Sequence, residues 1–249
     1  MLEKIALIPA RYAASRFPGK LMQMLGDKTV IRTTYDNTVA TGLFDAVAVV
    51  CDSPIIYDEI TRHGGKAIMS RAEHQCGTDR IAEALEHFPH AAIIVNVQGD
   101  EPFTQKEPLQ KLLQAFEGEE GKDVAVVSLM QVLQHPENIA DPNYVKVAVD
   151  KRMNALFFSR SVIPYPRDTS TAITYYEHIG IYAFRRQTLI DFTQMEMTPL
   201  ELAEKIECLR YLENGIKMKM VPTQYMGVEI DTPEDLQKAG AYLSKLGQH

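Results

Sequence analysis

Short runs of β-branched and other apolar residues alternate with amphipathic segments through residues 5–97 of this chain. This alternation is typical of βαβ units, in which helices cover both faces of a parallel sheet. We therefore predict an α/β fold built on a mainly parallel twisted sheet. The expected strands are Ile5–Ile8, Ala46–Cys51, Ala67–Met69 and Ala91–Val97, and the expected helices are Val30–Thr41, Pro54–His63 and Arg80–Phe88.

Residues at the ends of one segment support this interpretation. Ser53 followed by Pro54 is a typical helix start, with a capping side chain and then proline at the first helical position. Gly64 and Gly65 can end the same helix in the left-handed conformation.

The second half of the chain has a different pattern, with four strand-like runs and little helix between the middle ones. We expect an antiparallel or mixed insertion subdomain at about 125–200, within a single domain over 1–249. A capping-box-like start at Thr232 opens the last helix. The runs are Val124–Leu133, Val145–Val149, Ala155–Phe158 and Ile179–Phe184, followed by a helix at Leu200–Glu213 and a strand at Lys217–Val221.

Composition narrows the class of protein. The 249 residues carry 26 Lys and Arg against 33 Asp and Glu, a net charge of −7. With no Lys/Arg block and a pI near 5.5, nucleic acid is not expected as a partner. Three scattered cysteines disfavour a disulfide scaffold or a zinc ribbon. No apolar run approaches a membrane span and no signal peptide is evident, so we expect a soluble cytoplasmic protein without membrane contact.

A basic loop follows the first predicted strand. Arg11, Arg16 and Lys20 lie within ten residues of one another, among small residues such as Ser15 and Gly19. Ligands in open α/β sheets bind at the carboxyl ends of strands, so this loop is suited to several phosphates. The alternative is a solvated basic loop. Because neither a G-x-x-x-x-G-K-[ST] nor a G-x-G-x-x-G motif is present, ATPase and dehydrogenase functions lose their main support.

Two acidic residues are expected at the same edge of the sheet. Asp100 follows the strand ending at Val97, and Asp231 precedes the last helix. Paired carboxylates near phosphates are what Mg²⁺ bound to a nucleotide requires. Taken singly, Asp100 could instead form a turn and Asp231 a helix cap. Their joint placement favours a metal site.

Six motifs, in the same order along the chain, resemble one enzyme family. The chain is similar to the 3-deoxy-manno-octulosonate cytidylyltransferases, the CMP-Kdo synthetases of Gram-negative lipopolysaccharide biosynthesis, from about residue 4 to residue 240. The resemblance implies a Rossmann-like nucleotidyltransferase fold, a homodimer, and Mg²⁺-dependent transfer of CMP from CTP to Kdo with release of pyrophosphate. The motifs are Ile8–Tyr12 with Ser15-Arg16 and Pro18–Lys20, His74–Arg80, Val95–Pro102, Phe158–Arg160, His178–Tyr182 and Asp231–Leu236.

The resemblance also assigns individual residues. Asp100 and Asp231 are expected to hold the metal and, with Lys20 and Arg11, to act in catalysis. The CTP phosphates are assigned to Arg11, Ser15, Arg16 and Lys20, the cytosine and ribose to Gln75, Cys76, Gly77 and Thr78, and Kdo to Arg80, Gln98, Arg160, His178, Tyr182 and Glu207.

Two positions depart from the family pattern. Cys76 stands where the family usually has Ser, and Cys208 stands where it commonly has Gln, next to Glu207. A thiol is a weaker hydrogen-bonding group than either side chain. These departures bear on fine base or sugar specificity. Two rival functions are kept: a cytidylyltransferase for another acidic sugar, such as 8-amino-Kdo or a sialic acid, and a catalytically silent nucleotide-binding regulator, against which the presence of Lys20, Asp100 and Asp231 speaks.

Overall fold

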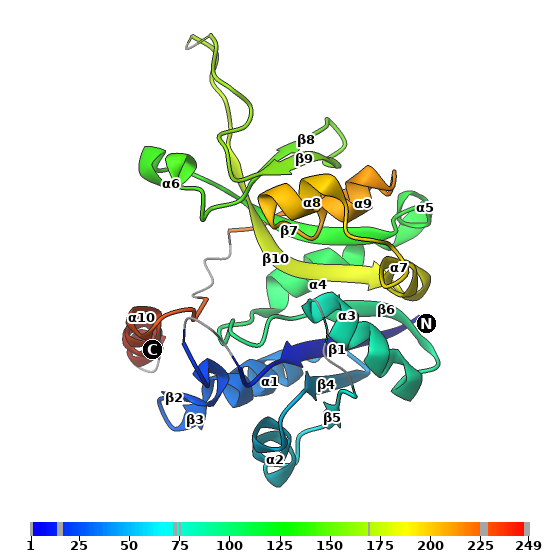
Figure 1. Cartoon of the computed structure of the whole chain (residues 1–249), viewed down its shortest axis with the longest axis vertical. Coiled ribbons are helices and arrows are strands. Elements are labelled where there is room, and N and C mark those ends of the chain that lie inside the picture. Colours follow the sequence, from blue (N-terminus) through cyan, green and yellow to red (C-terminus); the bar gives the residue numbers. More distant parts are fainter. Residues whose placement is uncertain are drawn as a thin grey trace. The chain divides into compact units, whose positions relative to one another are not determined.

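The computed structural model describes residues 2–13, 17–71, 74, 76–168, 170–224 and 229–246. Backbone contacts divide the chain into two compact units, and Figure 1 labels most of their helices and strands. The first unit comprises Met1–Glu107 together with Met226–His249, and the second comprises Pro108–Tyr225. The range of about 125–200 expected for the insertion lies inside the second unit.

The first unit contains the predicted parallel strands. They form a parallel arrangement in the order β6, β1, β4, β5, so that β1 lies between β6 and β4. Each strand is followed by a loop at the same edge, where the sequence concentrates its charged residues. The strands are β1 (Glu3–Ala10), β4 (Ala46–Cys51), β5 (Ala67–Met69) and β6 (Ala91–Asn96).

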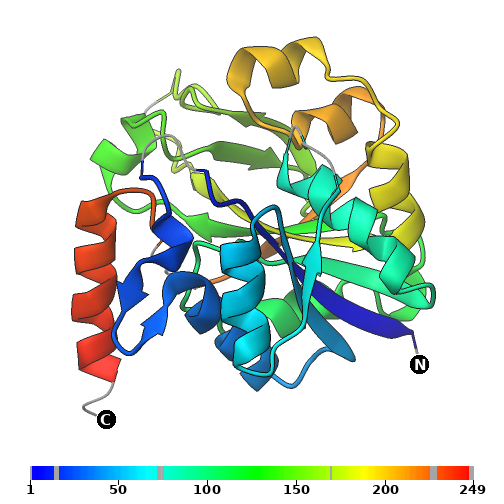
Figure 2. The ribbon, with the colours of Figure 1, turned by 60° about the horizontal axis from the view of Figure 1, so that its bottom comes forward.

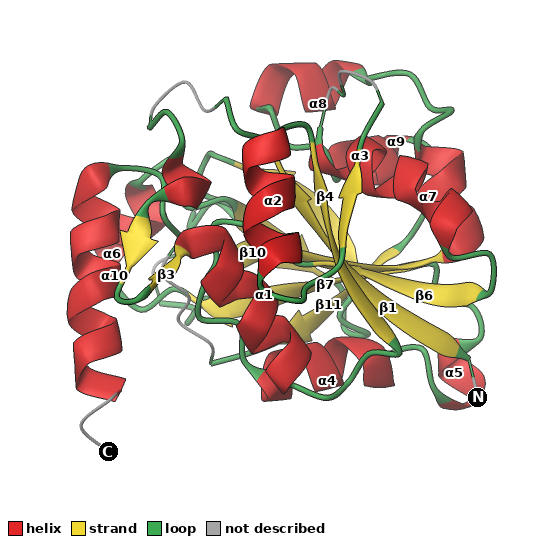
Figure 3. Ribbon diagram, turned by 90° about the horizontal axis from the view of Figure 1, so that it is seen from below, coloured by secondary structure: helices red, strands yellow, loops and turns green. Residues whose placement is uncertain are grey.

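Helices cover the strands of this unit. Helices α1 and α2 pack against β4, and α3 packs against β1; Figure 3 shows α1 and α2 beside the yellow strands. The helices are α1 (Val30–Ala40), α2 (Pro54–Arg62), α3 (Gly77–Glu83) and α10 (Pro233–Leu246), with short 3₁₀ turns η1 (Lys20–Met22) and η2 (Ala84–His87) and a hairpin of β2 (Met24–Leu25) and β3 (Lys28–Thr29).

The predicted helix ends are confirmed by their capping contacts. The Ser53 hydroxyl accepts a hydrogen bond from the Ile55 N–H at 3.2 Å, and Gly64 has a φ of 80°. Thr232 and Asp235 cap α10 reciprocally, since the backbone N–H of each donates to the side chain of the other. These bonds satisfy N–H groups that a helix start leaves without partners.

The last helix returns to the start of the chain. Figure 2 shows α10, in red, beside the blue β2–β3 hairpin. A Cβ added to Gly26 in that hairpin would lie 2.8 Å from Leu243, and the Phe103 and Tyr242 rings pack edge to face at 4.7 Å. This packing places the segment before α10 in the same unit as the basic loop.

The second unit has a mixed sheet, as expected. Strand β10 pairs antiparallel with β7 and β8, β8 pairs antiparallel with β9, and β11 runs parallel to β7. The strands are β7 (Val126–Val132), β8 (Lys146–Val149), β9 (Ala155–Ser159), β10 (Tyr176–Arg185) and β11 (Met218–Pro222). The remaining helices are α4 (Lys106–Gln114), α5 (Gly118–Gly121), α6 (Pro136–Ala140), α7 (Arg186–Phe192), α8 (Pro199–Glu204) and α9 (Leu209–Glu213).

The single helix predicted over Leu200–Glu213 is wrong, because two short helices, α8 and α9, replace it. Lys205 ends α8 in the left-handed conformation, with φ of 55°. A buried ion pair between Glu201 and Arg210, with contacts of 2.5 and 2.7 Å, then holds the two helices together. Bidentate pairing of this kind compensates the cost of burying both charges.

Membrane-crossing segments were sought among the helices that the structure describes. None of these helices is long and apolar enough to cross a bilayer.

Candidate active site

A glycine lets the turn after β6 approach the carboxyl end of the neighbouring strand β1. A Cβ on Gly99 would lie 2.9 Å from the Pro9 carbonyl oxygen, so a larger residue would force the two strand ends apart. The Thr34 hydroxyl donates to the Gly99 carbonyl at 2.9 Å and ties the turn to α1. Asp100, the next residue, is thereby presented at this edge of the sheet.

The segment before α10 joins the same edge. The Ile230 N–H donates to the Asp100 carbonyl oxygen at 3.0 Å, which places Asp231 beside Asp100 despite their separation in sequence. Side-chain oxygens of Asp100, Glu229 and Asp231 all lie within 4.8 Å of one another. The predicted proximity of Asp100 and Asp231 is therefore observed, and Glu229 adds a third carboxylate that sequence analysis did not assign.

Lys20 meets both predicted aspartates. Its ammonium donates to a carboxylate oxygen of Asp100 at 2.5 Å and to one of Asp231 at 2.7 Å. Burial alone lowers the pKa of Lys20, but the two carboxylates outweigh burial and raise that pKa above its ordinary value. Lys20 is therefore a fixed positive charge at neutral pH.

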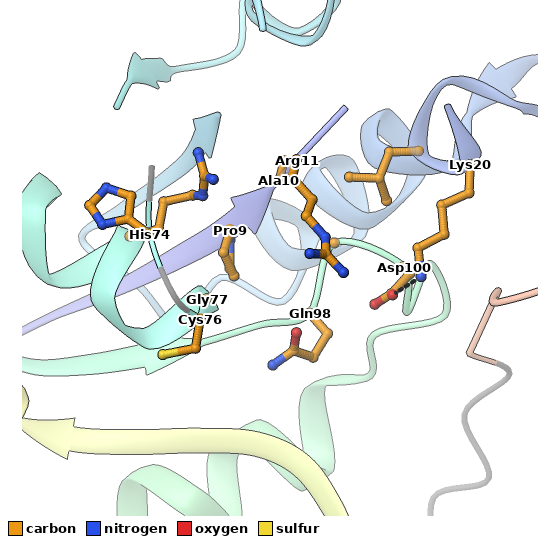
Figure 4. Close-up of a pocket in the computed structure, with 12 residues that line it drawn as sticks. Pro9, Ala10, Arg11, Lys20, His74, Cys76, Gly77, Gln98 and Asp100 are labelled. Carbon is orange, nitrogen blue, oxygen red and sulfur yellow. Dashed lines mark hydrogen bonds and ion pairs between the residues drawn. The ribbon is translucent and has the colours of Figure 1, made fainter. Parts of the chain in front are cut away.

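A cavity of about 260 Å³ opens beside this cluster. Figure 4 shows Arg11 and Gln98 reaching into the space next to Lys20 and Asp100. This volume is close to the lower end of typical small-ligand sites. The wall combines apolar residues at the end of β1 with charged groups from the basic loop, α3 and the turn after β6. It is formed by Pro9, Ala10, Arg11, Lys20, Leu21, His74, Cys76, Gly77, Arg80, Gln98, Gly99 and Asp100.

The carboxylate cluster fits a divalent metal. Three carboxylates are a hard-oxygen donor set, the kind that Mg²⁺ prefers together with phosphate oxygens. The Lys20 ammonium forms ion pairs with two of them, Asp100 and Asp231. Asp100 and Asp231 are partly buried and Glu229 is exposed.

Residues assigned to the base and ribose lie at the start of α3. Cys76 occupies the N-cap position of α3, and its side chain does not cap the helix. Gly77 and the buried Thr78 form its first turn. A serine side chain is a better helix-capping acceptor than the thiol of Cys76. Ser15, Arg16 and Gln75 lie outside the described residues.

His178 and Tyr182, assigned to the sugar, lie on β10 of the second unit. The His178 Nε2 lies 3.0 Å from the Ser128 hydroxyl, and the His178 ring packs edge to face on Phe158 at 4.9 Å. Part of His178 remains exposed, yet the surrounding groups desolvate the ring and lower the pKa of His178 to about 4. At neutral pH the ring is therefore uncharged.

The Tyr182 hydroxyl contacts Cys208, the second cysteine that departs from the family pattern. It lies 4.0 Å from the Cys208 sulfur, which is fully buried. Burial, with the nearby negative charge of Glu207, raises the pKa of the Cys208 thiol far above its ordinary value. Cys208 is therefore a neutral packing group behind Tyr182.

Arg160 is held by the backbone of its own unit. Its Nε donates to the Glu204 carbonyl at 2.8 Å and its Nη1 to the Pro142 carbonyl at 3.0 Å. Glu207 lies just before α9 and is partly buried. The residues assigned to Kdo thus divide between the units, with Arg80 and Gln98 in the first and Arg160, His178, Tyr182 and Glu207 in the second.

Several known proteins are similar to this chain in sequence. The sequence model of the cytidylyltransferase family matches residues 5–220. The 3-deoxy-manno-octulosonate cytidylyltransferase of Christiangramia forsetii is 57% identical over 96% of this chain and 96% of that protein. The enzyme of the same name from Flavobacterium johnsoniae is 55% identical over 96% of this chain and 98% of that protein.

Solved structures agree. The structure of a CMP:2-keto-3-deoxy-manno-octonic acid synthetase complexed with CTP is 36% identical, with a TM-score of 0.91, and the match covers 98% of this chain and 99% of that one. A 4-diphosphocytidyl-2C-methyl-D-erythritol synthase from Anaerococcus prevotii, 19% identical with a TM-score of 0.64 over 97% of this chain and 99% of that one, shares the fold. The chain therefore belongs to the cytidylyltransferase family, within the group of 3-deoxy-manno-octulosonate cytidylyltransferases.

Proposed function

We propose that this protein transfers CMP from CTP to 3-deoxy-D-manno-octulosonate (Kdo). In this reaction the anomeric hydroxyl of Kdo attacks the α-phosphorus of CTP. A new P–O bond forms to the sugar, the bond to the β-phosphate breaks, and the products are CMP-Kdo, pyrophosphate and the hydroxyl proton. The observation that carries the proposal is the cavity at the carboxyl ends of β1 and β6, where Arg11 and Lys20 face the carboxylate cluster.

The cationic residues suit a triphosphate. Arg11 and Lys20 line the same cavity, and Lys20 is protonated throughout the physiological pH range. Positive charge beside the β- and γ-phosphates stabilises the charge that develops on departing pyrophosphate. Because phosphoryl-type transfer needs positioning and charge stabilisation, no covalent nucleophile is required. We assign this role to Lys20, supported by Arg11.

We further propose a Mg²⁺ requirement. Asp100 and Asp231 would hold the ion, with Glu229 beside them. The bound metal would act as a Lewis acid on phosphate oxygens. Lys20 forms ion pairs with Asp100 and Asp231, so its positive charge lies next to the carboxylates that would hold the ion.

We assign Kdo to the residues that the resemblance to the family gives to the sugar. Kdo carries a carboxylate, which an arginine recognises better than a lysine does because the planar guanidinium offers paired donors. Arg80 and Arg160 are therefore the candidates for the carboxylate. The neutral ring of His178 and the hydroxyl of Tyr182 are donors or acceptors suited to sugar hydroxyls.

We also propose a cytoplasmic homodimer. Three large apolar side chains of the second unit are strongly exposed, with Tyr165 at 81%, Leu156 at 62% and Val132 at 50%. Exposed apolar groups of this size in one unit are suited to covering by a second copy. Sedimentation of the protein, compared with a Leu156→Glu variant, tests this association.

Product analysis tests the reaction directly. Purified protein is incubated with CTP, Kdo and Mg²⁺, and the mixture is followed by ³¹P NMR and mass spectrometry. We expect stoichiometric pyrophosphate and a phosphodiester with the mass of CMP-Kdo. Hydrolysis of CTP without a sugar adduct, or no consumption of CTP, would contradict the proposal.

A further inference from the structure

Asp52 lies at the active-site edge of the sheet but belongs to no motif discussed so far. It directly follows β4, and the parallel register pairs Cys51 with Ala10 of β1. The residue after β4 is therefore brought next to the residues after β1, which are the first residues of the basic loop. Asp52 is the acidic residue at this junction.

One oxygen of Asp52 holds the beginning of the basic loop. The Tyr12 N–H donates to Asp52 Oδ1 at 2.9 Å. The Tyr12 carbonyl in turn accepts from the Gly19 N–H at 3.3 Å, so Tyr12 joins the two ends of the loop. Gly19 has a φ of 65°, a conformation that favours glycine, and Lys20 follows it. Asp52 therefore anchors the loop from which Lys20 extends.

The other oxygen of Asp52 holds Arg80. The Arg80 Nη2 donates to Asp52 Oδ2 at 3.2 Å, and its Nη1 donates to the Ser70 hydroxyl at 2.6 Å. The Arg80 side chain is 8% exposed, and Arg80 also lines the cavity. Two acceptors on different nitrogens restrict the plane of a guanidinium, so the direction of its remaining donors is restricted too.

We propose that Asp52 is a positioning residue that aligns two cationic elements of the cavity, the basic loop and Arg80, with a single carboxylate. The inference rests on the proposed function, in which the loop serves the CTP phosphates and Arg80 serves the acidic sugar. Oδ1 of Asp52 affects the binding of CTP, and Oδ2 of Asp52 affects the binding of the acidic sugar. Its effect is transmitted through Tyr12 and Arg80.

A role in stability alone does not account for this arrangement. The Asp52 side chain is 34% exposed, so solvent partly screens its charge, whereas the side chain of its partner Arg80 is 8% exposed. A carboxylate used only for stability would not need to bind both Tyr12, at the start of the basic loop, and Arg80, in the cavity wall. The two contacts instead restrict the start of the basic loop and the Arg80 guanidinium, whose directions matter for binding the substrates.

Two substitutions separate the two contacts. In Asp52→Asn the amide oxygen can still accept from the Tyr12 N–H, but the amide nitrogen cannot accept from Arg80. Asp52→Ala removes both contacts. Ser70→Ala removes the other acceptor of Arg80, and Asp58→Asn on the exposed face of α2 is the matched control for an Asp-to-Asn change. Circular dichroism and melting temperature confirm that each variant is folded.

The measurements are KM for Kdo at saturating CTP, kcat, and Kd for CTP by calorimetry without sugar. We expect Asp52→Asn to raise KM for Kdo about tenfold or more, since hydrogen bonds to charged groups have that magnitude, with Kd for CTP within about twofold of wild type. Asp52→Ala should weaken CTP binding as well, and Ser70→Ala should affect Kdo only. The control should match wild type.

The inference is overturned if Asp52→Asn leaves KM for Kdo unchanged, or if Asp52→Ala binds CTP as tightly as Asp52→Asn does. Failure of the proposed function would look different, because wild-type protein would then show no turnover with Kdo. In that case the CTP-binding comparison still tests the anchoring of the loop by Asp52.

Discussion

Lys20 and Asp231 are separated by 211 positions in the sequence, yet their charged atoms lie 2.7 Å apart. Lys20 starts the 3₁₀ turn after the basic loop, and Asp231 precedes the last helix. Both termini of the chain therefore contribute to one charged cluster. The catalytic assignment depends on this convergence, and the predictions below test it from several sides.

Removing one carboxylate of the cluster should abolish most of the activity. We expect Asp100→Asn and Asp231→Asn each to lower kcat at least ~100-fold, because metal-held charge stabilisation amounts to several kcal/mol. Circular dichroism should show an intact fold, and Asp58→Asn should keep wild-type kcat. Full activity of either variant, or undiminished turnover in excess chelator, would exclude the metal mechanism.

Lys20→Ala tests the role of the ammonium during transfer. If Lys20 stabilises charge that develops on the leaving pyrophosphate, kcat/KM for CTP should fall mainly through kcat. Steady-state kinetics with CTP varied at high Kdo shows whether kcat or KM changes. A rise in KM at unchanged kcat would make Lys20 a ground-state phosphate ligand instead.

The neutral His178 predicts a pH dependence of stability. Its folded pKa of about 4 lies below the ordinary 6.5, so between these values the unfolded chain binds a proton that the folded chain does not. Stability from this residue is therefore complete above pH 6.5 and falls toward pH 4. The slope has an upper limit of roughly 1.4 kcal/mol per pH unit, the value for one proton, and the partial exposure of His178 makes the actual slope smaller.

The measurement is urea unfolding at pH 7 and pH 5. His178→Asn should lose less free energy of unfolding than wild type between these two pH values, whereas His87→Asn, at an exposed position, should behave as wild type. Equal losses in wild type and His178→Asn would contradict the lowered pKa.

Arg160→Lys separates sugar recognition from nucleotide binding. Lysine keeps the charge but cannot reproduce the planar donors that hold the Glu204 and Pro142 carbonyls and that we propose for the Kdo carboxylate. We expect KM for Kdo to rise about tenfold or more, with Kd for CTP within about twofold of wild type. If Arg160→Lys weakens CTP binding without Kdo as much as it raises KM for Kdo, Arg160 supports the fold and does not recognise the sugar.

Much of the first unit could be predicted from the sequence. Strands β4 and β5 have the predicted bounds, β1 extends two residues further at each end, and β6 ends one residue earlier than predicted. Parallel strands end at a common edge, which is why the proximity of the basic loop after β1 to Asp100 after β6 could be expected before any coordinates. In the described part of this unit Asp231 follows no strand, and it is placed there by the Ile230–Asp100 backbone hydrogen bond. Glu229 and Asp52 were missed, although the parallel register of β1 and β4 places Asp52 beside the basic loop.

The helices of the second unit were harder to predict. The break at Lys205 has no local signal, because lysine does not favour the left-handed conformation, and the Glu201–Arg210 pair that fixes it is tertiary. A signal for α4 was present in Leu109, Leu112 and Leu113, whose spacing gives one apolar helix face. Sequence analysis did not assign that helix.

Substrate selectivity tests the central claim most directly. CTP, UTP, ATP and GTP are each combined with Kdo, 8-amino-Kdo and a sialic acid, and pyrophosphate release is measured with Mg²⁺ present. The account predicts pyrophosphate from CTP with Kdo at the highest kcat/KM, and none above background from the Asp100→Asn protein. Equal release from all four nucleotides, a higher kcat/KM with another sugar, or no release with any pair would contradict it.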